Sequence, residues 1–365
     1  MFAAHILDLD DLRWTQPATY GSLVNGHSAV TFAVLAGVSI ALVTGGTQVQ
    51  SAEQLVTARH QLLVRACCIF LIGGVLQMLG TPILVILVMY SFLFVLALPL
   101  LRVSVRALLI AAAAVAAVMP LLVPPLHAAL GAWGSPFNAL SDILINGGYP
   151  GLIWSAYLLL GLAVGRMDLR SERIAKELIK FGAGIAAAAY LLSAALLPLQ
   201  DAVDPDREFQ PPSQFWAPYD SPGDGFRWNL SDLLGLLGSE PHSGTPFDVV
   251  GSAGISLVVI GLCLLVVRDP TPWSFPLRAT GTMALTVYSA HIVVIFVLCH
   301  SFERGEDGVY PWQNTLTWLL FVAIAMAVSS LWIHRFRRGP LERIITTIAV
   351  RSSGAAAKPA GQSVE

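Results

Sequence analysis

The sequence predicts an all-α, polytopic integral membrane protein built as a helix bundle. Of its 365 residues, 55% are hydrophobic and 12% are charged, whereas about 25% of the residues in a soluble domain are charged. Apolar stretches long enough to cross a bilayer recur along the whole chain. The basic residues concentrate in alternate connections between these stretches. Together these observations predict a multi-pass protein and exclude a soluble fold.

A transmembrane helix needs about 20 mostly apolar residues, and nine full spans are expected on this basis. They lie near 27–45, 62–80, 83–101, 107–123, 149–166, 178–198, 249–267, 279–299 and 313–334. Residues 1–345 would form a single transmembrane domain with a long outer loop over 199–248. Residues 346–365 are expected to be a disordered cytoplasmic tail, because the chain from Ser352 is rich in Ala, Gly and Ser.

The distribution of charge predicts the orientation. One alternating set of connections, with the span ends beside it, holds 17 of the 21 Lys and Arg residues. By the positive-inside rule this set is cytoplasmic. The C-terminus is then cytoplasmic, and the predicted location is the cytoplasmic (inner) membrane. The net charge of −2 gives no indication of a nucleic-acid partner.

The same alternation places residues 8–26 outside, so Met1–Leu7 should be the outer end of a helix that starts in the cytoplasm. This segment lacks the basic start, the full apolar core and the small-residue cleavage site of a signal peptide. We therefore expect a start upstream of Met1 and ten spans in the complete protein, the first of them truncated here.

Histidines are the candidate catalytic residues, because an imidazole can accept and return a proton near neutral pH. Most of them fall in the outer half of the predicted bundle. The candidates are His5, His27, His242 and His291. Structural roles stay open for three of them: a carboxylate pairing for His5, capping of the following helix by Asn25 beside His27, and a hydrogen bond to a neighbouring helix for His291.

Three junctions between a loop and a span carry dense polar detail: 25–28, 146–150 and 240–248. The candidate substrate-binding residues are Asn25, Asn146, Tyr149 and, in the same span as His291, Tyr288. Aromatic and acidic residues in the outer loop 199–248 suit the binding of sugars, although anchoring at the membrane interface explains Trp and Tyr equally well.

Five arginines flank the cytoplasmic span ends and could hold the phosphates of a nucleotide-like cofactor. They are Arg59, Arg65, Arg102, Arg106 and Arg166. For any one of them, a role in topology or in binding lipid headgroups is the stronger alternative. The four cysteines show no disulfide pattern, and no metal-binding motif is present.

Several of these segments resemble bacterial relatives of heparan-alpha-glucosaminide N-acetyltransferase, within the wider transmembrane acyltransferase superfamily. The segments are 32–40 (FAVLAGVSI), 149–166, 241–245 (PHSGT), 283–291 (MALTVYSAH) and 338–342 (RGPLE). The resemblance covers roughly residues 1–345 and is weak for the identity of a substrate.

The resemblance implies transfer of an acyl group through the membrane. Acetyl-CoA would bind from the cytoplasm as the acyl donor, and the acceptor would be a sugar or glycan on the outer side, with no metal required. A histidine near the outer side would act as base. His5 is the first candidate and His27 the second. Related families carry an arginine about ten residues before that histidine, a position that would precede Met1.

Two other functions remain open from the residues alone. A secondary transporter of a small solute also has broken helices and polar residues at mid-membrane depth, and a non-catalytic membrane partner in envelope biogenesis is a third reading. Most spans are apolar throughout, which favours the enzyme.

Small residues at Ala33, Gly37 and Ala41 recur every four positions and permit close helix contact, including contact in a homodimer.

Overall fold

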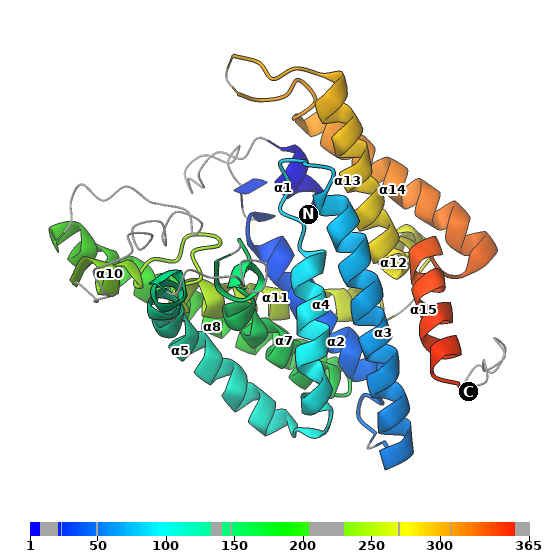
Figure 1. Ribbon diagram of the computed structural model, residues 1–365, viewed down its shortest axis with the longest axis horizontal. Coiled ribbons are helices and arrows are strands. Elements are labelled where there is room, and N and C mark those ends of the chain that lie inside the picture. The colour runs from blue at the N-terminus through cyan, green and yellow to red at the C-terminus, as the bar shows by residue number, and fades with distance from the viewer. Residues whose placement is uncertain are drawn as a thin grey trace. The chain divides into compact units, whose positions relative to one another are not determined.

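The computed structural model describes residues 1–7, 21–22, 24–48, 50–132, 141–146, 148–203, 230–268, 271–306 and 308–354. Every regular element in these ranges is a helix (Figure 1). The predicted all-α class is therefore confirmed for the part of the chain that is described.

Six helices are long and apolar enough to cross a membrane. They are α3 (Ala52–Gln77), α5 (Val105–Ala132), α8 (Glu172–Val203), α11 (Pro246–Val266), α13 (Ala284–Ser301) and α14 (Thr315–Phe336). Three shorter apolar helices are α2 (His27–Val43), α4 (Leu87–Ala97) with the 3-10 turn η2 (Leu98–Arg102) after it, and α7 (Gly151–Gly165). All nine predicted spans overlap these helices, which supports a multi-pass membrane protein, while the number of helices that cross stays a prediction.

The remaining elements are short helices and one amphipathic helix. They are α1 (Phe2–Ile6), η3 (Asp142–Asn146), α10 (Leu230–Gly235), η5 (Pro272–Ser274), α12 (Phe275–Thr282) and α15 (Pro340–Ser352). Residues 346–352 belong to α15, which buries Ile345 and Ala349. The predicted disordered tail is therefore wrong over that segment. Residues from 355 onward lie outside the described part.

The chain divides into two compact units. The first unit comprises Ala3–Leu42 and Arg102–Asp269 with Met1, and the second comprises Val43–Leu101 and Pro270–Glu365 with Phe2. In the first unit α2 and α7 touch backbone to backbone. A Cβ on Gly37 would overlap the carbonyl of Leu158, and one on Gly161 would overlap that of Val34. The small-residue stripe of α2 is therefore used inside this unit.

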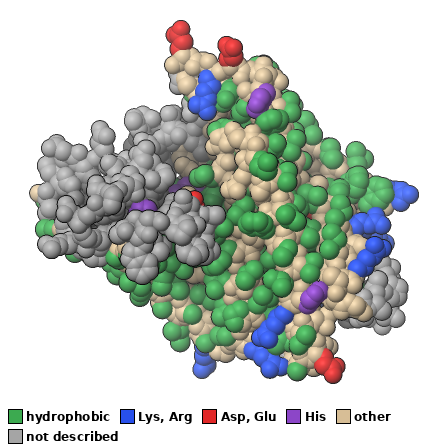
Figure 2. Space-filling view, in the orientation of Figure 1, with side chains coloured by type: hydrophobic (Ala, Val, Ile, Leu, Met, Phe, Trp, Pro, Cys, Tyr) green, Lys and Arg blue, Asp and Glu red, His purple; other side chains and the backbone are tan. Residues whose placement is uncertain are grey.

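In the second unit α3 packs against α4 and α15. Large apolar side chains nevertheless face outward from its long helices, as on α3 at Leu71 and Val75 and on α14 at Leu331. Figure 2 shows hydrophobic side chains spread over the face where α3 and α13 lie. A surface this apolar is stable against lipid tails rather than water, in agreement with a bilayer environment.

Candidate functional site

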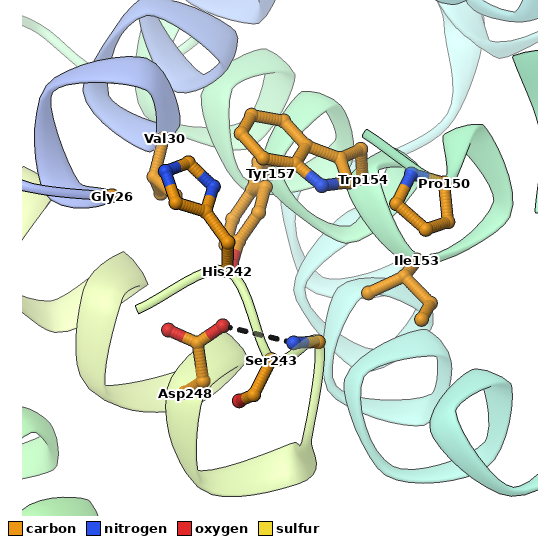
Figure 3. Close-up of a pocket in the computed structure, with 10 residues that line it drawn as sticks. Gly26, Val30, Pro150, Ile153, Trp154, Tyr157, His242, Ser243 and Asp248 are labelled. Carbon is orange, nitrogen blue, oxygen red and sulfur yellow. Dashed lines mark hydrogen bonds between the residues drawn. The ribbon is translucent and has the colours of Figure 1, made fainter. Parts of the chain in front are cut away.

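A pocket in the first unit brings together the three polar junctions that the sequence analysis singled out (Figure 3). One wall is the start of α2, the second is the start of α7, and the third is the turn that enters α11. The lining residues are Gly26, Val30, Pro150, Ile153, Trp154, Tyr157, His242, Ser243, Gly244 and Asp248. Each wall comes from a different part of the chain, so the pocket exists only in the folded unit.

The turn before α11 has a specific local structure. Thr245 caps the helix, because its Oγ1 accepts from the Asp248 N–H at 3.2 Å and donates to the Gly238 carbonyl at 2.6 Å. His242 and Gly244 both have positive φ, 65° and 66°. A left-handed backbone costs a non-glycine residue about 1 kcal/mol, so the contacts of this turn must hold His242 in place.

Asp248 lies at the centre of the hydrogen bonds around the pocket. It is 4% exposed. Its Oδ2 accepts from the Gly244 N–H at 3.1 Å, the dashed line in Figure 3, and its Oδ1 accepts from Ser252 Oγ at 3.0 Å. One carboxylate therefore fixes both the turn that carries His242 and the side chain of Ser252 one helical turn further along α11.

His27, the first residue of α2, continues this chain of hydrogen bonds. Its Nδ1 lies 3.0 Å from Ser252 Oγ. Because Ser252 donates its single proton to Asp248, it accepts the bond from Nδ1–H. Nε2 of the partly exposed His27 ring is then the nitrogen that carries the lone pair. Thr31 Oγ1 and Ser256 Oγ, 3.0 Å apart, form a second polar link between α2 and α11.

His242 sits among aromatic rings. Its ring centroid is 5.8 Å from that of Tyr149, which lies 4.9 Å from Trp154, and Trp154 lies 5.2 Å from Tyr157. Figure 3 shows His242 between Val30 on one side and Trp154 and Tyr157 on the other. Burial lowers the pKa of His242 below its ordinary value, because desolvation penalises the charged form. The imidazole is therefore neutral near pH 7 and offers one donor and one acceptor.

Of the residues that the sequence analysis proposed, His242 lines the pocket. Tyr149 packs against His242, and His27 is hydrogen-bonded to Ser252, so both lie beside the pocket without being among its lining residues. Asn25 precedes α2 and accepts the His27 N–H on its carbonyl at 2.8 Å. Asn146 ends η3, and its side chain is outside the described part. His5 belongs to α1 in the first unit and is not among the pocket residues.

His291 and Tyr288 lie on α13 in the second unit. His291 is 3% exposed, with its ring centroid 5.2 Å from that of Tyr288. The Tyr288 hydroxyl accepts from the Ile86 N–H at 3.2 Å, which satisfies a backbone donor at the start of α4. Tyr288 therefore links α13 to the start of α4, and a catalytic role for His291 or a substrate-binding role for Tyr288 stays a prediction.

The five candidate cofactor arginines are divided between the units. Arg102, Arg106 and Arg166 belong to the first, and Arg59 and Arg65 to the second. A common cofactor site for all five stays a prediction. Among the described residues, no group of three or more His, Cys, Asp and Glu side chains is placed to hold a metal ion.

Sequence reasoning missed the residues that organise the site, namely Asp248, Ser252 and Tyr190, whose hydroxyl lies 3.5 Å from Ser252 Oγ. A signal was present in α11, where Asp248, Ser252 and Ser256 recur every four residues in an otherwise apolar helix. Positions four apart share one helix face, and an acid within an apolar span is a functional candidate by default.

Comparison with known proteins adds one match. Residues 238–351 match the family described as "Protein of unknown function (DUF418)". The matched segment begins just before the His242 turn and includes α11 to α15. It therefore contains His242, Asp248 and Ser252 but not His27. Searches of curated proteins and of solved structures found no match to the chain.

Proposed function

We propose that the protein is a membrane-embedded acyltransferase. It moves an acyl group, acetyl in the simplest case, from cytoplasmic acyl-CoA to a hydroxyl or amine of an extracytoplasmic sugar or glycan. The observation that carries the proposal is the chain Asp248–Ser252–His27. A carboxylate that orients an imidazole through a hydrogen bond, leaving the second nitrogen basic, is the arrangement that general-base catalysis of acyl transfer needs.

In this mechanism Nε2 of His27 takes the proton of the acceptor hydroxyl as its oxygen attacks the thioester carbonyl carbon. The tetrahedral intermediate collapses by breaking the carbon–sulfur bond, and the CoA thiolate leaves with the proton from His27. While His27 is protonated, its positive charge is balanced through Ser252 by the Asp248 carboxylate. A thioester is already activated, so a base and an oxyanion donor suffice without a metal.

His242, which lines the pocket, supplies the second polar group of the proposed mechanism. Because it is neutral near pH 7, its single N–H can donate to the oxyanion that forms on the acyl carbonyl. Trp154 and Tyr157 line the pocket, and Tyr149 packs against Trp154. In the proposed mechanism this aromatic side disfavours water, which would strengthen each hydrogen bond at the reacting centre. Two of the segments that resemble transmembrane acyltransferases, 149–166 and 241–245, contribute residues to these walls.

A proton-coupled transporter is the second candidate, and a specific observation favours it. Asp248 is a buried carboxyl inside the apolar helix α11, connected to His27 through Ser252. Chains of Asp and His within membrane helices also serve as proton relays. In that reading the pocket would bind a small solute whose movement is coupled to a proton.

The test is acyl transfer by the purified full-length protein in lipid nanodiscs, with radiolabelled acetyl-CoA and a panel of hydroxyl and amino sugars. We expect label to reach an acceptor with release of CoA, and His27→Ala to lower the rate by about 10²–10⁴-fold. His300→Ala is the matched control, because His300 is exposed on α13 with Nδ1 bonded to the Phe296 carbonyl. Solute-driven proton movement in proteoliposomes without any acyl transfer would instead establish the transporter.

A further inference from the structure

Helix α15 is held within the second unit by a partly buried acid, Glu342. Glu342 Oε1 accepts from the N–H groups of Leu285 and Thr286 at 2.8 and 3.0 Å, and its Oε2 accepts from Thr286 Oγ1 at 2.6 Å. In return the Leu341 N–H donates to Thr286 Oγ1 at 3.1 Å. Glu342 therefore caps the start of α13, and its negative charge is used within the protein.

The inner face of α15 is also occupied. Ile345 and Ala349 are buried, and α15 packs along α3 (Figure 1). Gln61 Nε2 on α3 donates to Ser353 Oγ at 3.1 Å just beyond the helix. These contacts fix the rotation of α15 about its axis, so its outer face is defined.

That outer face combines apolar and basic side chains. Ile344 and Ile348, one turn apart, are 53% and 45% exposed. Arg343 and Arg351 are exposed beside them. An amphipathic helix with aliphatic residues flanked by arginines is the pattern of helices that lie in the headgroup region of a bilayer.

The segment from the end of α14 to the end of α15 is mainly positively charged. Residues 335–354 contain five arginines and a single acid, Glu342, and Glu342 is hydrogen-bonded internally. Figure 2 shows Lys and Arg side chains gathered over the end of α14 and the start of α15. The exposed charge therefore favours an anionic partner.

Arg65 on α3 indicates where one anionic group would bind. Its Nε is buried and, within the described residues, has no hydrogen-bond partner. Its electrostatic neighbour is Arg338, a second cation, in the turn between α14 and α15. The positive charge of Arg338 acts on Arg65, and the Arg65 Nε–H is an unused donor, so this corner of the unit favours a phosphate oxygen.

We propose that the α15 surface, formed by Arg65, Arg338, Arg343, Ile344, Ile348 and Arg351, binds anionic phospholipid. The isoleucines enter the boundary between headgroups and acyl chains, and the arginines bind the headgroup phosphates. The adjoining helices α3 and α14 are both candidate membrane spans, which places the surface where lipid headgroups are available. An alternating apolar and basic helix face fits this partner better than it fits a polar phosphorylated protein.

The test uses the full chain in nanodiscs of phosphatidylcholine alone or mixed with phosphatidylglycerol. Hydrogen exchange of residues 340–352 is measured in each, and retained lipid is counted by native mass spectrometry. We expect phosphatidylglycerol, but not phosphatidylcholine, to protect α15. Each arginine near an anionic surface contributes about fivefold in affinity, so R343Q/R351Q should need roughly thirtyfold more phosphatidylglycerol for the same protection.

The variant I344S/I348S should lose the protection with an unchanged melting temperature, because both side chains are already exposed. R304Q is the matched control, since Arg304 lies beyond the other end of α14 and stacks on Tyr310 at 4.9 Å. If a double variant does not fold, the single variant R351Q replaces it and should need about fivefold more phosphatidylglycerol for the same protection. Equal protection in both lipids, or protection by free CoA in phosphatidylcholine but not by phosphatidylglycerol, would overturn the proposal.

Discussion

Replacing Asp248 by Asn should invert the hydrogen bonds that orient His27. The carboxylate accepts two bonds, from the Gly244 N–H and from Ser252 Oγ, whereas an amide can accept on only one side. If the amide oxygen keeps Gly244, its NH₂ group faces Ser252, which must then accept. Ser252 is left to donate its proton to Nδ1 of His27, and the proton of the imidazole moves to Nε2.

This tautomer cannot act as a base at Nε2. With the fold intact, we expect D248N to lower the acyl-transfer rate by about 10²–10⁴-fold. Folding itself should be little affected, because the pocket keeps both bonds with roles exchanged. By contrast D248A removes the acceptor of the buried Ser252 hydroxyl and of the partly buried Gly244 N–H, and should reduce the free energy of unfolding by about 1–3 kcal/mol.

Two measurements check this reasoning. Initial rates of CoA release give the loss of activity, and nitrogen-15 NMR of labelled histidine, assigned with His27→Ala, reports which ring nitrogen of His27 carries the proton. The control is Thr31→Val, which removes the separate link from Thr31 to Ser256 and should leave the tautomer unchanged. A folded D248N protein that retains its rate within threefold, or whose His27 still carries the proton on Nδ1, would refute the proposed orientation.

Three further predictions concern stability. G161A should lower the free energy of unfolding by about 1–3 kcal/mol, because the added Cβ would overlap a carbonyl of α2. The control is G184A on α8, whose Cβ would meet nothing within 4 Å and should not destabilise the protein. Equal melting temperatures of the two variants would contradict the close α2–α7 contact. Burial lowers the pKa of His242, so on acidification the unfolded chain is protonated at this residue before the folded protein is. The free energy of unfolding should therefore fall as pH drops below about 6.5. Thermal unfolding of H242Q should show a smaller fall with pH, and an identical pH dependence would exclude this contribution of His242. E342A removes the cap of α13 and should cost about 1–3 kcal/mol with faster hydrogen exchange in α15; unchanged exchange would show that Glu342 does not hold the helix.

Much of the fold was predictable because a bilayer restricts what a chain can do. In lipid the backbone N–H and C=O groups must form hydrogen bonds within their own segment, so apolar stretches of sufficient length form helices. All nine predicted spans accordingly overlap apolar helices. The prediction of disorder over 346–352 failed for a tertiary reason, since α15 is stabilised by Glu342 against α13 and by Ile345 against its neighbours.

The candidate site was predictable only in parts. The sequence by itself determined that this is a helical membrane protein, and it marked His27, Tyr149 and His242 at polar junctions where spans begin. Only the tertiary structure decided that these junctions meet at one pocket and that Tyr288 and His291 lie in the other unit. The physical reason is distance along the chain. Ser252 and His27 are 225 residues apart, and the residues around each of them do not indicate that their side chains form a hydrogen bond.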